Sequence, residues 1–325
     1  MTQPDRSKLA IDGGAPVRST PFAPWPHYAE DEIAAVQRVL ASGKVNYWTG
    51  QECRGFEQDY ATLLGRPHAI ALANGTLALE LALRAFGIGA GDEVIVTCRS
   101  FIASAGAAVV CGATPVLADV DADSQNISAA TVEPMISPRT RAIIAVHLAG
   151  WPCDMDALQA LAKRHGLYLI EDCAQAHGAQ WRGRPVGSFG DASAFSFCQD
   201  KIITTGGEGG LLVLSDTAAW ERAWSYKDHG KSHAAMFQRQ HAPGYRWVHE
   251  TFGSNWRLTE MQAIIGRRQL KKLDGWVARR RAHGQRLTSA LAALPGLRVA
   301  NPPAPVKHAY YKFYAFLDPH DLLPG

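Results

Sequence analysis

One lysine stands out among the residues that could carry chemistry. Lys201 lies in the stretch "SFCQDKIITTGGEGG" (196–210), between an apolar, strand-like segment and a turn rich in glycine. A lysine held in such a bend is expected to be shielded from water, which favours the neutral amine as a nucleophile toward an aldehyde or ketone. Gly206 and Gly207 permit the tight turn that this requires. The alternative is a surface lysine beside a flexible turn.

Two carboxylates follow another apolar segment, "LYLIEDCAQAHGA" (167–179). Glu171 and Asp172 point to opposite faces if the strand continues through them. Unpaired charge at the end of a buried strand is costly, so one of the two should meet a buried cation. A protonated heteroaromatic nitrogen would serve, with Gln175 donating to a nearby phenolic oxygen. A helix cap or a metal ligand remains an alternative for this pair.

A third motif, "NGTLALE" (74–80), begins at a junction between a strand and a helix. Free amides and the positive end of the helix dipole bind anions at such a point, commonly phosphate. The alternative is an ordinary helix N-cap by Asn74 or Thr76.

The elements that must position these motifs alternate along the chain. Strands are predicted at 68–73, 92–97, 114–120, 141–150, 167–173, 192–198 and 209–216, and helices at 76–86, 100–111 and 154–166. Strands separated by helices need crossover connections, so the pattern predicts an α/β fold with a mostly parallel sheet flanked by helices. Ligands bind beyond the carboxyl ends of such strands, so the three motifs and "TCRSF" (97–101) should face one crevice.

After Asp216 the pattern changes to long helices at 217–230 and 259–294, followed by a strand at 308–317. We expect a large α/β domain with an N-terminal arm at 1–270 and a smaller α+β domain at 271–325. The chain ends soon after the last predicted strand, so we expect this smaller domain to be incomplete.

Composition bounds the function. The 325 residues are 47% hydrophobic and 19% charged, which is typical of a soluble globular protein. The net charge of +3 is too small for a nucleic-acid or membrane surface. The first residues do not have the pattern of a signal peptide, which predicts a cytoplasmic location. The six cysteines are scattered singly, without the spacing of metal ligands.

Taken together, the motifs match the needs of one cofactor. Pyridoxal 5'-phosphate requires an anion site, a group against the ring face, an acid at the ring nitrogen and a lysine for its aldehyde. The Asn-Gly-Thr motif, Phe101, the acid after the interior strand and Lys201 supply these in turn.

Four segments closely resemble the DegT/DnrJ/StrS family of pyridoxal-phosphate sugar aminotransferases, which has fold type I of the aspartate aminotransferase superfamily. They are "FSFCQDKIITTGGEGG", "EDCAQAHGA", "NGTLALELAL" and "GSNWRLTEMQAIIG" (253–266). The resemblance implies a homodimer that transfers an amino group, usually from glutamate, to a keto group on a nucleotide-linked sugar. It also implies a place in the biosynthesis of amino sugars for a surface polysaccharide, glycan or antibiotic.

The resemblance also implies roles for single residues. Lys201 forms the Schiff base and carries the proton, Asp172 lies at the pyridinium nitrogen, and Gln175 helps to hold the ring hydroxyl. Phe101 stacks on the ring. The phosphate contacts fall on Gly75, Thr76, Ser196 and, from the second subunit, Asn255, so each site would need two chains.

Two other functions are compatible with this scaffold. A sugar dehydrase replaces the lysine with histidine, whereas this sequence keeps Lys201; the other is a catalytically silent regulator or scaffold. For five further residues the sequence is compatible with either a role in the site or a structural role: His177, His229, Trp48, Arg257 and Lys227.

Overall fold

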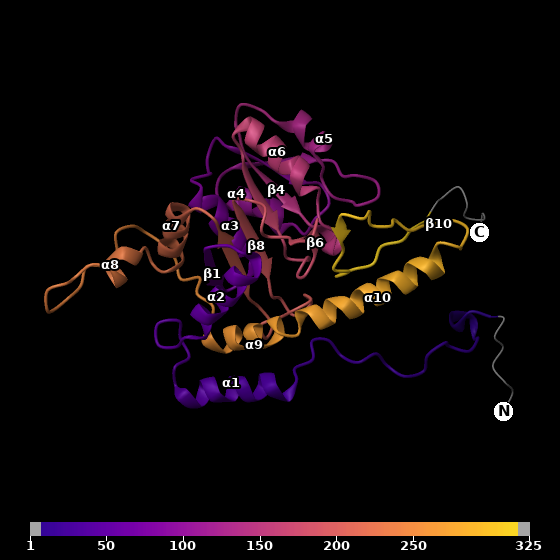
Figure 1. The fold of residues 1–325 in the computed structure, drawn as a ribbon, viewed down its shortest axis with the longest axis horizontal. Helices are drawn as coiled ribbons and strands as arrows, with labels where there is room; N and C mark the ends of the chain where they lie inside the picture. The colour runs from indigo at the N-terminus through magenta and orange to yellow at the C-terminus, as the bar shows by residue number, and fades with distance from the viewer. Residues whose placement is uncertain (1–7, 318–325) are drawn as a thin grey trace.

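A seven-stranded sheet forms the centre of the protein (Figure 1). A computed structural model of the chain describes residues 8–317. Across the sheet the order is β1 (His68–Leu72), β9 (Gly210–Leu214), β8 (Ala192–Ser196), β5 (Tyr168–Asp172), β4 (Thr140–Val146), β2 (Glu93–Thr97) and β3 (Thr114–Ala118).

Strand direction follows the predicted pattern. Strand β9 runs antiparallel to β1 and β8, and the other neighbouring pairs are parallel. Every residue of β2, β8 and β9 is buried, as expected for strands covered on both faces. The predicted α/β fold with a mostly parallel sheet is therefore confirmed.

Helices cover both faces of the sheet. One face packs against α3 (Gly75–Ala85), α4 (Ala103–Val110) and α7 (Thr217–Lys227) in a single apolar cluster. The other face packs against α2 (Glu52–Leu64), α6 (Met155–His165) and α9 (Glu260–Leu270). Helix α1 (Glu30–Ser42) packs on α9 through Ala35, Val39 and Ile264.

The predicted helix over 259–294 is two helices, because α9 ends at Leu270 and α10 (Leu273–Leu291) begins after a short break. Leu273 and Val277 of α10 still pack against the core of the larger unit. We propose the break as the boundary between the two domains. In Figure 1, α10 and the N-terminal stretch extend toward one end of the molecule, and α8 (His233–Phe237) projects from the other.

The strand predicted over 308–317 was wrong. Only Phe316–Leu317 (β12) pairs, with β10 (Leu297–Arg298). Before it, Tyr310 has a left-handed φ of 51°, and the amides of Ala309 and Lys312 donate to the carbonyls of Gly150 and Ala149. The aromatic residues that suggested a strand instead dock as an irregular segment against the large domain.

The remaining elements are short. They are α5 (Ala129–Val132), β6 (Gln180–Trp181), β7 (Arg184–Pro185) and β11 (Val306–Lys307), with three 3-10 turns at Ala10–Asp12, Glu133–Met135 and Leu148–Gly150. Among the described residues, no helix combines the length and apolar character needed to cross a membrane.

Candidate functional site

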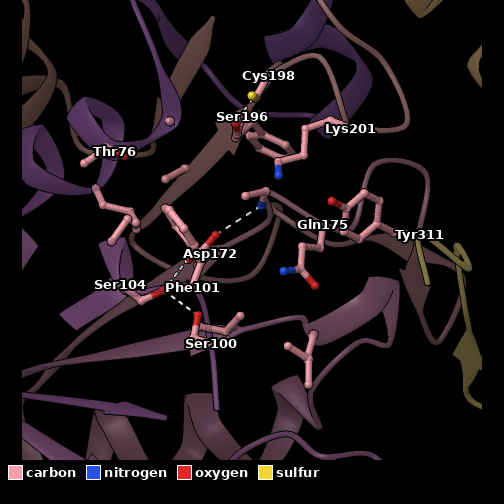
Figure 2. A pocket seen from close by; sticks show the side chains of 18 of the residues that line it. Thr76, Ser100, Phe101, Ser104, Asp172, Gln175, Ser196, Cys198, Lys201 and Tyr311 are labelled. Carbon is pink, nitrogen blue, oxygen red and sulfur yellow. Dashed lines mark hydrogen bonds between the residues drawn. The ribbon is translucent and has the colours of Figure 1, made fainter. Parts of the chain in front are cut away.

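A cavity of about 860 Å³ lies beyond the carboxyl ends of β1, β2, β5 and β8 (Figure 2). The motifs singled out in the sequence meet there. The predicted site residues that line it are Gly75, Thr76, Phe101, Asp172, Gln175, Ser196 and Lys201. Asn255 is exposed and does not line this cavity.

Lys201 is carried by the loop between β8 and β9. The loop is tied across its base, where the Phe197 amide donates to the Gly209 carbonyl at 2.8 Å and the Gln199 amide to the Gly207 carbonyl at 2.9 Å. Gly207 has a φ of 127°, a conformation that residues with side chains rarely adopt. The lysine side chain is only 16% exposed and extends into the cavity.

Asp172 ends β5 with its carboxylate on the cavity side (Figure 2). It accepts hydrogen bonds from the Ser104 hydroxyl at 2.8 Å and the Ala174 amide at 3.1 Å. Burial raises the pKa of Asp172, and these two donors and the charge of Lys201 offset only part of that effect. The site is therefore suited to a bound cation, which would favour the carboxylate form.

Glu171 faces the opposite side of the sheet. Its carboxylate accepts from His147 at 3.0 Å and from the amides of Gly187, Phe189 and Gly190 at 2.7 Å each. Burial opposes the charge, but these hydrogen bonds hold the pKa of Glu171 below its usual value. The two acids thus have different roles. Glu171 binds the loop at 187–190, and of the two only Asp172 faces the cavity.

The start of α3 forms the anion cradle that the sequence suggested. The Asn74 side chain accepts from the Leu77 amide at 3.0 Å, and the amides of Gly75 and Thr76 have no acceptor within the helix. A Cβ at Gly75 would lie 2.6 Å from the Ser196 Cβ, so glycine is needed for α3 and β8 to come together. This cradle fits the phosphate of pyridoxal phosphate.

The rest of the cavity also fits the cofactor. The Gln175 side-chain oxygen accepts from the Ala149 amide at 2.6 Å, which leaves its NH₂ group free to donate to a ring hydroxyl. Phe101 is 70% exposed and lines the cavity as an apolar platform. The residues present therefore match the phosphate, ring hydroxyl, ring face and ring nitrogen.

His177 does not contact Asp172 but joins two structural elements. Its Nε2 lies 2.8 Å from the Ser196 carbonyl and its Nδ1 lies 2.7 Å from the Tyr60 hydroxyl. Only a protonated Nε2 can bond to the carbonyl, so Nδ1 accepts from Tyr60. Burial lowers the pKa of His177 to about 4.

This buried histidine predicts a pH dependence of stability. Between pH 6.5 and 4 the unfolded chain binds a proton at His177 that the folded protein rejects, so stability falls as the pH decreases. Lowering the pH from 7 to 5 should cost the wild type roughly 2 kcal/mol more than a His177→Gln variant. Urea unfolding of both proteins at the two pH values measures this difference. Parallel losses in both would contradict it.

The other residues considered lie away from the cavity. Trp48 packs against Trp224 and Phe237, and Lys227 is buried with its ammonium 3.5 Å from the centre of the Tyr47 ring. Arg257 donates to the Asp228 carboxylate. The backbone amide of His229 donates to the Ser254 carbonyl.

The sequence motifs gave no individual role to six of the residues that line the cavity: Arg99, Ser104, Asp200, Tyr311, Lys312 and Tyr314. Arg99 and Asp200 lie in segments that were expected to face it. Ser104 follows Ser100 at helical spacing, and the two hydroxyls are 2.7 Å apart, so the spacing was an available signal. Tyr311 had none, because its place depends on the irregular docking of 308–315.

Residues 26–322 match the sequence model of the DegT/DnrJ/EryC1/StrS aminotransferase family. The chain belongs to this family. The family indicates pyridoxal phosphate as the cofactor, and relatives 41–45% identical are named aminotransferases or transaminases, so the chain is a pyridoxal-phosphate aminotransferase of fold type I. The resemblance stated from the four motifs is confirmed.

Relatives of this aminotransferase act on sugars and on cyclitols. It is 45% identical over 81% of its length to a dTDP-3-amino-3,4,6-trideoxy-alpha-D-glucose transaminase of Streptomyces venezuelae, covering 66% of that protein. It is 41% identical over 98% of its length to an L-glutamine:2-deoxy-scyllo-inosose aminotransferase of Streptoalloteichus tenebrarius, covering 76%.

Among solved structures, the aminotransferase from Psychrobacter cryohalolentis is similar with a TM-score of 0.91 and 53% identity. The match covers 93% of this chain and 79% of that one.

Proposed function

We propose that this aminotransferase transfers an amino group from glutamate to a keto group on a nucleotide-linked sugar, in the biosynthesis of an amino sugar. The observation that carries the proposal is the meeting of Lys201 and Asp172 in one cavity with an anion cradle at the start of α3. In this proposal Lys201 is the catalytic residue. The sugar dehydrase alternative is disfavoured because a lysine, and not a histidine, occupies this position.

The proposed roles follow from the contacts. Bound pyridoxal phosphate supplies an aldehyde that accepts the donor's amino group and a ring that takes up electrons. Gly75, Thr76 and Ser196 bind the phosphate, and Phe101 and Gln175 orient the ring. Asp172 keeps the ring nitrogen protonated.

Lys201 has two tasks in this scheme. Its Nζ would hold the cofactor through the aldehyde until a donor amine takes its place. The freed amine would then move a proton from the donor's α-carbon to the former aldehyde carbon, and in the second half of the reaction it would move a proton back to the carbon of the keto substrate. Its low exposure keeps bulk water away from the proton while it moves.

Two further features support the finer parts of the proposal. Arg99 and Lys312 line the cavity, and these cations could bind the diphosphate of a nucleotide-linked substrate. Asn255 lies outside the cavity of its own chain, as a residue acting in a partner's site would. The nearby exposed aromatic residues Tyr245, Trp247 and Phe252 favour a homodimer with shared sites.

Activity against a panel of substrates tests the proposal. The purified protein, loaded with pyridoxal phosphate, is given glutamate or glutamine with keto-sugar nucleotides, the corresponding free keto-sugars and keto-inositols. We expect turnover with glutamate and a nucleotide-linked sugar. If the only turnover is that of a keto-inositol with glutamine as the donor, the substrate class is that of the cyclitol relatives. If the protein does not bind the cofactor, the silent scaffold is favoured.

An Arg99→Gln variant tests the proposed contact between Arg99 and the diphosphate of the nucleotide. Loss of one charged hydrogen bond should raise KM for the nucleotide-linked sugar by roughly tenfold and leave KM for glutamate unchanged. Equal effects on both substrates would show that Arg99 does not discriminate between them.

A further inference from the structure

Asp200 is a charged residue of the cavity that has no part in the roles above. It directly precedes Lys201, and its two carboxylate oxygens lie 3.0 and 3.1 Å from the lysine Nζ. The lysine therefore has a fixed acceptor that belongs to its own loop. Asp200 also lines the cavity, so this contact faces the site of reaction.

Tyr311 joins the same group from a distant part of the chain. Its hydroxyl donates to Asp200 Oδ2, and the Lys201 Nζ lies 5.3 Å from the centre of its ring. The segment that carries Tyr311 is anchored by the Lys312 amide, which donates to the Ala149 carbonyl at 3.2 Å. The Ala149 amide in turn donates to Gln175.

Exposure shows why the tyrosine matters. The Asp200 side chain is 54% exposed, against 16% for Lys201, and an exposed pair of neighbouring charges is by itself weak. The hydrogen bond from Tyr311 favours the orientation in which the carboxylate faces Lys201. Although burial opposes its charge, the hydrogen bonds from Tyr311 and Lys201 lower the pKa of Asp200. Burial and the neighbouring carboxylate raise the pKa of Tyr311, so the phenol remains a donor.

We propose that Asp200 is a positioning residue that holds the amine of Lys201 after the donor has displaced it, and that Tyr311 fixes the carboxylate for this purpose. The inference rests on the proposed role of Lys201. No bond between heavy atoms changes in this step: Nζ keeps the proton that it has taken, and the carboxylate keeps Nζ within reach. The C-terminal segment thereby contributes to proton transfer without touching the cofactor.

Lysine labelling tests the contact directly. The full chain without cofactor is treated with acetic anhydride at one fixed pH, and the rate of acetylation of Lys201 is followed by peptide mass spectrometry. Asp200→Asn should raise this rate by roughly threefold, because the amine loses the carboxylate that holds it. Glu208→Gln removes a carboxylate from the same cavity that does not bond to Lys201, and its rate should match the wild type. An unchanged rate in Asp200→Asn, or equal changes in both variants, would overturn the contact.

Kinetics of the holoenzyme test the purpose of the contact. In the single-turnover reaction with the donor alone, Asp200→Asn should lower the maximal rate constant by roughly tenfold and leave the donor concentration for half-maximal rate within a factor of about two. Asp200→Glu should recover part of this loss, and Tyr311→Phe should show a smaller loss of the same kind. An unchanged rate constant in Asp200→Asn overturns the role of Asp200, and an unchanged rate constant in Tyr311→Phe overturns that of the tyrosine.

Borohydride trapping separates this inference from the proposed function. If the cofactor is trapped on Lys201 in Asp200→Asn, and the labelling and kinetics of this variant equal those of the wild type, only the role of Asp200 is overturned. Trapping on a different lysine in the wild type overturns the proposed function.

Discussion

Replacement of Lys201 with alanine is expected to abolish covalent attachment of the cofactor and to lower kcat by at least roughly 10³-fold. The variant loses both the amine that attaches to the aldehyde and the group that moves the proton. Phosphate and ring contacts remain, so the variant should still bind pyridoxal phosphate without a covalent bond. Borohydride reduction followed by peptide mapping measures attachment, and turnover with both the donor and the keto substrate measures kcat.

Lys312→Ala is the matched control, because Lys312 lies in the same cavity. It should keep borohydride-stable cofactor on the peptide that contains residue 201. A labelled peptide in Lys201→Ala, or its loss in Lys312→Ala, would show that the attachment site has been wrongly assigned.

Replacement of Asp172 with asparagine should separate activity from stability. Without the carboxylate the ring nitrogen loses its proton, and we expect kcat to fall by roughly 10³-fold. The pKa of Asp172 is raised in the folded protein, so the ionised carboxylate destabilises the cofactor-free fold at neutral pH. This loss of stability disappears as the pH falls and the carboxylate becomes protonated. The neutral amide removes the penalty and still accepts from Ser104. The cofactor-free variant should therefore unfold at the same or a higher urea concentration than the wild type.

Glu171→Gln provides the opposite case at the next residue. The lowered pKa of Glu171 shows that its charge is favoured in the folded state, so the amide should destabilise the protein by roughly 2 kcal/mol. It should leave the absorbance of the bound cofactor unchanged.

If Asp172→Asn retained kcat within about tenfold, the assignment of Asp172 to the ring nitrogen would be wrong.

The sequence predicted those parts of the site that depend on position along single strands. Apolar runs identified the strands, and the residues just after them, including Lys201, reach the cavity. Alternation alone could not decide between Glu171 and Asp172, because it shows that two side chains diverge but not which face holds the ligand. That choice depends on His147 and on the amides of a loop, which meet Glu171 only in the folded chain.

Packing between distant segments accounts for the rest. A lysine is expected to face solvent, yet Lys227 is buried against the ring of Tyr47. The segment 308–317 has the aromatic residues typical of a strand, but the amides of Ala309 and Lys312 within it donate to the carbonyls of Gly150 and Ala149. Neither partner is close in sequence, so no local pattern could reveal it. For the same reason Tyr311 was absent from the predicted site.

The antiparallel strand β9 has a consequence for how the molecule opens. The loop bearing Lys201 leaves β8 and returns directly into β9, which is bonded on its other side to β1. Opening of β9 itself would break its ladders with both β8 and β1, so we expect slow amide exchange along Gly210–Leu214. Lys201, the proposed attachment point of the cofactor, therefore lies on a loop whose two ends are both held by this part of the sheet.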